Sequence, residues 1–291
     1  MSSSSESGAR SAPPSVRIAT VLNSLQPTER RVADLVLQSP ETVVELTAQE
    51  LADRVGIGRS SVIRACQSFG YRGFPQLRVA LAGELAAHGD SGTDYDESVV
   101  GRMHAAIDRV AQSLPQAISM LDDEVVSAAV RSVAEARRLL VVANGLSAPI
   151  ASDLSMRLTA VGRPAEFVPD AIAQQIAASG LGWQDVCLVI SGSGANESSL
   201  RAAAAARNAA SIVALTSFAS SALTELADRS LVIAPSGVSF RDELEHTSRV
   251  AHAVFVEVFV DAVARELGSR AADARGRVLE ILSENLTDAG E

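Results

Sequence analysis

The sequence of 291 residues contains no lysine, so all 25 of its Lys and Arg residues are arginines. Schiff-base catalysis and the Walker-type phosphate loop both need a lysine amine, and the sequence therefore excludes both. Aromatic residues make up only 3% of the chain while apolar residues make up 47%. Alanine, valine, leucine and isoleucine must therefore build the core.

Cysteine, histidine and long apolar runs are also scarce. The two cysteines, Cys66 and Cys187, lie in separate apolar segments, which favours reduced core residues over a disulfide or a metal site. The four histidines have no ligand spacing, so we predict neither a metal nor a cofactor. There is no run of 18 apolar residues, and the Ser-rich start lacks the apolar core of a signal peptide. These observations predict a soluble cytoplasmic protein without a membrane partner.

Composition divides the chain into four parts, in keeping with the two domains expected for this length. Residues 1–16 are rich in Ser, Gly, Ala and Pro and predict a disordered tail. Residues 17–87 predict an all-helical domain, with helices from Pro27 to Leu37 and from about Pro75 to Ala87. Residues 88–98 are short, polar and acidic, which indicates a linker, and residues 99–291 form the second domain.

A basic segment interrupts this acidic protein, whose net charge is -10. Residues 54–83 hold five arginines and no Asp or Glu. Because the charge of this segment opposes that of the whole chain, nucleic-acid phosphate is the expected partner.

The same segment has the pattern of two short helices joined by a tight turn. Thr47 and Glu50 have capping-box spacing, and the glycines of residues 56–58 end the first helix. In the second helix, from about Arg59 to Phe69, three apolar residues face inward (Val62, Cys66 and Phe69), and the opposite face is polar (Ser60, Ser61, Arg64, Gln67 and Ser68). This pattern predicts a helix-turn-helix. An ordinary amphipathic hairpin with a solvated arginine face is the alternative.

In the second domain, continuous apolar runs alternate with helical segments. The runs cover residues 139–143, 186–190, 212–215 and 231–233, and residues 166–168 predict a further short strand. Buried strands that alternate with helices indicate right-handed crossovers and a parallel sheet. We therefore predict an α/β three-layer sandwich after the helical domain.

Small hydroxyl residues follow the predicted strands, namely Ser147, Ser191, Ser193, Thr216 and Ser217. Ligands of open α/β sheets bind beyond the carboxyl ends of the strands, where hydroxyls and helix amides hold phosphate. A dinucleotide site is disfavoured because no G-x-G-x-x-G follows any strand. The alternative is that these serines only cap helices.

These motifs resemble those of a known family. Residues 143–147, Asp170 and residues 190–194, 214–217 and 227–228 resemble a SIS (sugar isomerase) domain. Together with Ser61-Val62-Ile63-Arg64 and residues 70–75, they make the chain resemble an RpiR-family bacterial transcription regulator over about residues 20–265.

The resemblance implies a homodimeric or homotetrameric regulator that binds an operator in double-stranded DNA and is controlled by a sugar-phosphate effector. The effector phosphate would be held by Gly145, Ser147, Ser191, Ser193, Gly194 and Asn196. On the DNA, base edges would be read by Ser60, Ser61, Arg64 and Gln67, while Arg59 and Arg72 would hold phosphates.

The sequence departs from the family pattern in both domains, and Gln67-Ser68 is less basic than is usual in the DNA-binding half. Ala143 stands where Gly is frequent, Asn196 where Thr is commoner, and Gly58 where a capping Ser is usual. The effector can therefore differ from the usual sugars, whereas Gly58 is still a tolerable N-cap.

Two other functions are compatible with the sequence. An aldose–ketose phosphate isomerase would need an acid and a base, which Glu243 or Glu245 with His246 could supply, although a charged, solvated helix start is the preferred explanation of these residues. Alternatively, the α/β domain binds no ligand and serves only for dimerisation, through the apolar stripe of a helix over residues 248–267.

Overall fold

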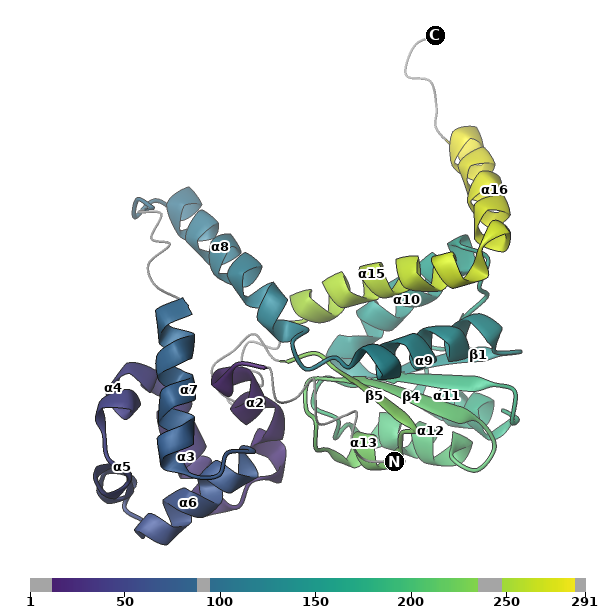
Figure 1. The fold of residues 1–291 in the computed structure, drawn as a ribbon. Helices are drawn as coiled ribbons and strands as arrows, with labels where there is room; N and C mark the ends of the chain where they lie inside the picture. The colour runs from purple at the N-terminus through teal and green to yellow at the C-terminus, as the bar shows by residue number, and fades with distance from the viewer. Residues whose placement is uncertain (1–11, 88–94, 235–247, 286–291) are drawn as a thin grey trace. The chain divides into compact units, whose positions relative to one another are not determined.

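The computed structural model describes residues 12–87, 95–234 and 248–285, which Figure 1 shows as a ribbon. The chain divides into two compact units. One is made mainly by the chain before residue 123, and the other mainly by residues 123–215, 222–231 and 252–285.

The first unit is helical, as predicted, and its helices begin earlier than predicted. Helix α2 starts at Pro14, inside the segment that the sequence predicted to be a disordered tail, and it buries Val16 and Ile18. Proline opens α2 because the first turn of a helix does not use its missing N–H. The helices are α2 (Pro14–Val21), η1 (Leu22–Ser24), α3 (Pro27–Gln38), α4 (Pro40–Glu45), α5 (Ala48–Val55), α6 (Arg59–Ser68) and α7 (Phe74–Ala87).

The ends of some helices in this unit differ from those predicted from the sequence. Helix α3 ends before Ser39-Pro40 as predicted, but Pro40 also opens α4, which was not predicted from the sequence. After the predicted linker, of which residues 88–94 lie outside the described residues, the Ser98 hydroxyl accepts from the Gly101 amide and caps α8 (Val99–Ala117).

The second unit contains the predicted parallel sheet. Its strands are β1 (Leu139–Ala143), β2 (Glu166–Phe167), β3 (Val186–Ile190), β4 (Ser211–Thr216) and β5 (Arg229–Val232), in the order β2-β1-β3-β4-β5. Every residue of β1 and β3 is buried, as expected for strands covered on both faces. The predicted fold class is confirmed.

Helices cover both faces of this sheet, as Figure 1 shows. Apolar side chains that alternate along β1, β3 and β4 form one core with residues of α11 and α12, while α9 and α10 lie on the other face. The helices are α9 (Asp123–Glu135), η2 (Gly145–Ser147), α10 (Ala148–Ala160), α11 (Ala171–Ser179), α12 (Glu197–Ala206), α13 (Ala222–Leu226), α15 (Val250–Leu267) and α16 (Ser269–Asn285).

The register of the strands places their carboxyl ends level with one another. Leu139 lies beside Val186 and Ala143 beside Ile190, and Ile190 in turn lies beside Leu215 of β4. The loops that follow β1, β3 and β4 therefore leave the sheet along one edge.

Both cysteines are buried, free thiols, as predicted. Burial raises the pKa of the Cys66 thiol and of the Cys187 thiol to about 12, so both stay protonated at neutral pH. The part of the chain that the structure describes contains no cluster of metal-ligating side chains. None of its helices is long and apolar enough to cross a membrane.

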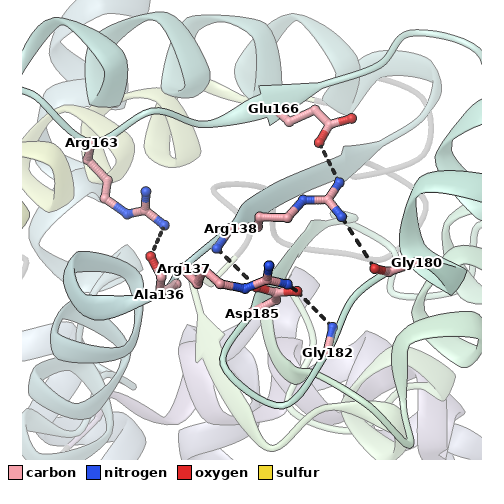
Figure 2. Close-up of polar contacts among 8 residues, drawn as sticks. All are labelled: Ala136, Arg137, Arg138, Arg163, Glu166, Gly180, Gly182 and Asp185. Atoms are coloured by element: carbon pink, nitrogen blue, oxygen red, sulfur yellow. Dashed lines mark hydrogen bonds and ion pairs between the residues drawn. The ribbon is translucent and has the colours of Figure 1, made fainter.

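At the opposite edge of the sheet, Asp185 fixes the amino ends of β1 and β3. Its buried carboxylate accepts from the amides of Gly182 (2.7 Å) and Arg138 (3.1 Å) and from the guanidinium of Arg137 (3.1 and 2.9 Å), as Figure 2 shows. Burial raises the pKa of this carboxyl, but the hydrogen bonds and the charge of Arg137 outweigh burial, and its pKa lies below the ordinary value.

We expect Asp185→Asn to lower the free energy of unfolding at pH 7 by about 2–3 kcal/mol, because it removes a buried carboxylate and leaves its donors poorly matched. Since the folded pKa is lowered, the carboxylate stabilises the wild type above the unfolded pKa of about 3.9, and this contribution disappears as the pH falls through the folded pKa. Urea unfolding at pH 7 and near pH 3 measures both effects.

Asp153→Asn is the matched control, because Asp153 pairs with Arg157 on the surface, where both side chains are more than a third exposed. It should cost at most about 0.5 kcal/mol. Equal losses in the two variants, or an Asp185→Asn loss that does not shrink in acid, would contradict the assigned role.

Candidate DNA-binding helix and candidate phosphate site

The predicted helix-turn-helix is formed by α5 and α6. The Glu50 amide donates to the Thr47 hydroxyl (3.3 Å) and the Thr47 amide donates to the Glu50 carboxylate (2.7 Å), which completes the predicted capping box. Gly56 ends α5 with a φ of 71°, a left-handed conformation that favours glycine. Gly58 then begins α6 without a side-chain cap.

Helix α6 presents one apolar and one polar face, as predicted. Val62, Cys66 and Phe69 are buried, whereas six residues outside the apolar face are exposed (Arg59, Ser60, Ile63, Arg64, Gln67 and Ser68). Ser61 is half-buried and accepts a hydrogen bond from Arg64 (3.1 Å), so the two side chains orient each other.

One residue of the predicted polar face has a role inside its own unit. The Ser68 hydroxyl donates to the Glu29 carboxylate of α3 (2.9 Å), so it connects two helices of the domain. Of the predicted polar positions, those near the amino end and centre of α6 are therefore the better candidates for contacts with a base edge.

The turn after α6 holds Arg72 at the surface. The Arg72 amide donates to the Gln76 side chain (2.7 Å), and its own side chain is exposed. The preceding residues are held by Arg17, whose guanidinium donates to the Gly70 carbonyl (2.7 Å) and lies 4.1 Å from the centre of the Tyr71 ring. Arg72 therefore extends from a fixed backbone.

The predicted phosphate-binding residues come together at the carboxyl edge of the sheet. Ser147 is buried in the turn after β1, and Ser191 is buried directly after β3. Since β1 and β3 are neighbours and end level, these two loops lie side by side. Gly145 and Gly194 have φ values of 60° and 63°, so each loop makes a turn that favours glycine.

The remaining predicted residues lie in the loop after β3. Ser193 is half-buried, and its hydroxyl accepts from the Ala195 amide (3.3 Å). Asn196 caps α12: its side-chain oxygen accepts from the amide (3.1 Å) and hydroxyl (3.2 Å) of Ser199. The Asn196 carbonyl oxygen therefore has a structural role, and its NH2 group is the part that could donate to a phosphate.

A buried glutamine, which was not predicted from the sequence, fixes the back of this site. The Gln174 side chain is fully buried and donates to the carbonyls of Ala143 (3.0 Å) and Val168 (2.7 Å). Its oxygen accepts from the Asn144 amide group (3.0 Å), which also donates to Ser199 (3.0 Å). This network joins the end of β1 to α11 and α12, and so holds the two predicted phosphate loops in place.

Other polar residues at this edge are engaged in the fold. Asp170, part of the predicted motif, accepts from the amides of Ile172 (3.1 Å) and Ala173 (2.7 Å) and caps α11. Thr216, the last residue of β4, and Ser217, which follows it, are both buried. Hydroxyls, amides and helix amino ends thus dominate the edge, an arrangement suited to binding an oxyanion without a fixed positive charge.

A helix-turn-helix joined to a parallel α/β domain with such an edge defines the class of ligand-responsive DNA-binding regulators. Residues 15–88 match the model of the helix-turn-helix domain of the rpiR family, and residues 132–254 match the SIS domain model. The chain therefore contains both domains, and it belongs to the RpiR family of transcription regulators.

Relatives and solved structures agree with this assignment. The chain is 27% identical, over 84% of its length and 88% of the relative, to an uncharacterized HTH-type transcriptional regulator of Caldanaerobacter subterraneus. It is 25% identical to the HTH-type transcriptional regulator HexR of Escherichia coli, over 94% of this chain and 95% of HexR. The structure of Vibrio vulnificus NanR complexed with ManNAc-6P has the same fold, with a TM-score of 0.58 and 23% identity over 94% of this chain and 100% of NanR.

Some relatives are longer proteins. The chain spans 44% of the length of the bifunctional protein glk of Burkholderia orbicola, with 28% identity over 97% of the chain. The activities of such a whole protein are not transferred to this chain.

Proposed function

We propose that this regulator binds a sugar phosphate at the carboxyl edge of its sheet and that the bound effector sets its affinity for an operator. One observation carries the proposal: the loops after β1 and β3 leave the same edge of the sheet from neighbouring strands, and each carries a buried serine, Ser147 and Ser191. Ser193, Asn196 and the backbone near Gly145 and Gly194 complete the site that we propose for the phosphate. NanR, which shares this fold, was solved with a sugar phosphate, and this supports the choice of ligand.

In the DNA complex, α6 would lie in the major groove. We assign the reading of base edges to Ser60, Ser61, Arg64 and Gln67, and phosphate contacts to Arg59 and Arg72. All of these residues except the half-buried Ser61 are exposed on α6 or on the turn after it, which supports this division. A homodimer or homotetramer would place two such helices on half-sites about 34–36 Å apart, or a multiple of that distance. The protein would then act in the cytoplasm.

Regulation, rather than catalysis, is the role proposed for the bound effector. An isomerase needs a base beside the carbon that loses its proton. Of the carboxylates at this edge, Asp170 caps α11 and Glu197 pairs with Arg201 (2.9 Å), so both have structural partners. The acid–base candidates Glu243, Glu245 and His246 lie outside the described residues.

A binding titration of the full-length wild type tests the proposal. Fluorescence anisotropy should show tighter binding to a duplex from the protein's own promoter region than to a random duplex at physiological salt. One member of a sugar-phosphate panel should change the affinity for the promoter duplex. Equal affinity for the two duplexes would refute operator recognition, and turnover of a panel member would replace regulation by catalysis.

A further inference from the structure

A charged pocket lies at the opposite edge of the sheet from the proposed effector site. It has a volume of about 610 Å³ and lies at the amino end of β1, where α9, the turn after α10 and α16 meet. Four arginines line it, Arg137, Arg138, Arg163 and Arg270, against two carboxylates, Glu135 and Glu166. Such a positive excess is unexpected in a protein with a net charge of -10.

Two of these arginines already have carboxylate partners. Arg137 is paired with Asp185, and Arg138 donates to Glu166 (3.0 Å) and to the Gly180 carbonyl (3.3 Å), as Figure 2 shows. Arg137 and Arg138 therefore have a structural role. Glu166, one of the two carboxylates that line the pocket, is already paired with Arg138.

Arg163 is different because it is buried without a carboxylate among the described residues. It is only 5% exposed, and its guanidinium donates to the carbonyls of Val133 (2.5 Å), Ala136 (2.8 Å) and Pro164 (3.0 Å). These bonds cap the carboxyl end of α9. Backbone carbonyls offer only partial negative charge, so a full positive charge remains in the wall of the pocket.

Arg270 places a second positive charge next to the first. Burial lowers the pKa of the Arg163 guanidinium, and the charge of Arg270 lowers that pKa further, as expected for neighbouring like charges. Arg270 lies in the first turn of α16, which contains no acidic residue, so it also opposes the positive end of the helix dipole. It is exposed and makes no ion pair with a described residue.

The backbone keeps this unfavourable arrangement in place. Gly162, with a φ of 82°, lies against the start of α16, and a Cβ at this position would lie 2.9 Å from the Ala274 Cβ and 3.2 Å from the Arg270 carbonyl. The first turn of α16 is therefore held close to Arg163, and the backbone of Arg270 cannot move away without disrupting this packing.

We propose that this pocket is a second anion site, in which Arg163 and Arg270 bind a phosphate group, either free or as part of a small metabolite. A phosphate would supply the negative charge that would balance both guanidiniums. Its oxygens would accept hydrogen bonds from the exposed N–H groups of Arg270. The site is separate from the proposed effector site and would give the regulator a second small-molecule input.

The test measures the thermal midpoint of the full-length protein against inorganic phosphate, with chloride at equal ionic strength as the reference. It is run in wild type and in Ser191→Ala/Ser193→Ala, so that binding at the proposed effector site is not counted. Phosphate should raise the midpoint in both proteins more than chloride does. Arg270→Gln should raise the apparent Kd for phosphate about tenfold, as expected when one charge-assisted hydrogen bond is removed. A phosphate monoester in parallel distinguishes a phosphorylated metabolite from free phosphate.

Two further variants make the result decisive. Arg277→Gln removes an exposed arginine of the same helix that does not line the pocket, and it should respond to phosphate as the wild type does. Arg270→Glu should raise the midpoint in phosphate-free buffer and abolish the phosphate response, because the new carboxylate takes the place of the anion. A response that Arg270→Gln leaves unchanged, or one that disappears only in Ser191→Ala/Ser193→Ala, would overturn the proposal.

Discussion

Replacement of Ser191 and Ser193 together by alanine is expected to abolish the response to the sugar phosphate while the protein stays folded. Each hydroxyl would donate one charge-assisted hydrogen bond to the phosphate, worth about 1.5–3 kcal/mol, so the double variant should bind at least about a hundredfold more weakly. In wild type, an effector at about a hundred times its Kd stabilises the folded protein by about 2.7 kcal/mol. A thermal-shift titration with a sugar-phosphate panel should show this gain in wild type and its absence in the variant.

Ser155→Ala is the control for this experiment. The Ser155 hydroxyl is buried in the same unit and has no hydrogen-bond partner among the described residues, so its removal should leave both stability and effector binding nearly unchanged. An effector response that survives in the double variant would place the ligand elsewhere. The absence of any response in a well-folded wild type would favour a sheet that serves only dimerisation.

Arg64→Ala is expected to have the largest effect on DNA recognition. Arg64 is exposed near the centre of the polar face of α6, and a bidentate arginine–guanine contact is worth about 1–3 kcal/mol of discrimination. Affinity for the promoter duplex should therefore fall about ten- to a hundredfold, with a smaller decrease on random DNA. Anisotropy titrations with both duplexes measure the ratio of the two affinities.

Arg59→Ala should behave differently, since Arg59 is assigned to a phosphate. It should weaken binding to both duplexes alike and reduce the slope of log K against log salt by about 1 for each DNA phosphate that the variant no longer neutralises. Arg207→Ala, which replaces an exposed arginine of the α/β unit, controls for the change in net charge. If Arg64→Ala lowers both affinities equally, Arg64 holds a phosphate and the base contacts lie elsewhere on α6.

The sequence was most informative where one physical requirement decided the structure. Buried parallel strands need continuous apolar runs, so β1 and β3 were predicted with the bounds that the structure shows. The α5–α6 turn was predictable because a capping box and a glycine turn are local signals. Helix α2 was missed because it starts with Pro14 and Ser15 at the end of a stretch whose composition is typical of disordered tails, and α4 because proline both ends and begins helices.

The hydrogen bonds and ion pairs that hold the site residues in place were not predictable from the sequence. Gln174 lies in an alanine-rich helix, and nothing local shows that its amide group reaches the carbonyls of Ala143 and Val168. The partnership of Arg137 with Asp185, and that of Arg163 with the end of α9, join residues about 30 to 48 positions apart. Such contacts depend on the register of strands and on the crossover path, which periodicity does not encode.

The strand order also determines when the regulator becomes responsive during its own synthesis. Strand β1 is the first strand to be synthesised, and it lies between β2 and β3 in the sheet. It can pair with β3 only after residue 190 has left the ribosome. The loops of the proposed effector site need both strands, whereas α2 to α7 all precede residue 88. Long-range parallel pairing is slow to form, and local helical contacts are fast. In a newly made chain the local contacts of α2 to α7 can therefore form before the two strands of the proposed effector site pair.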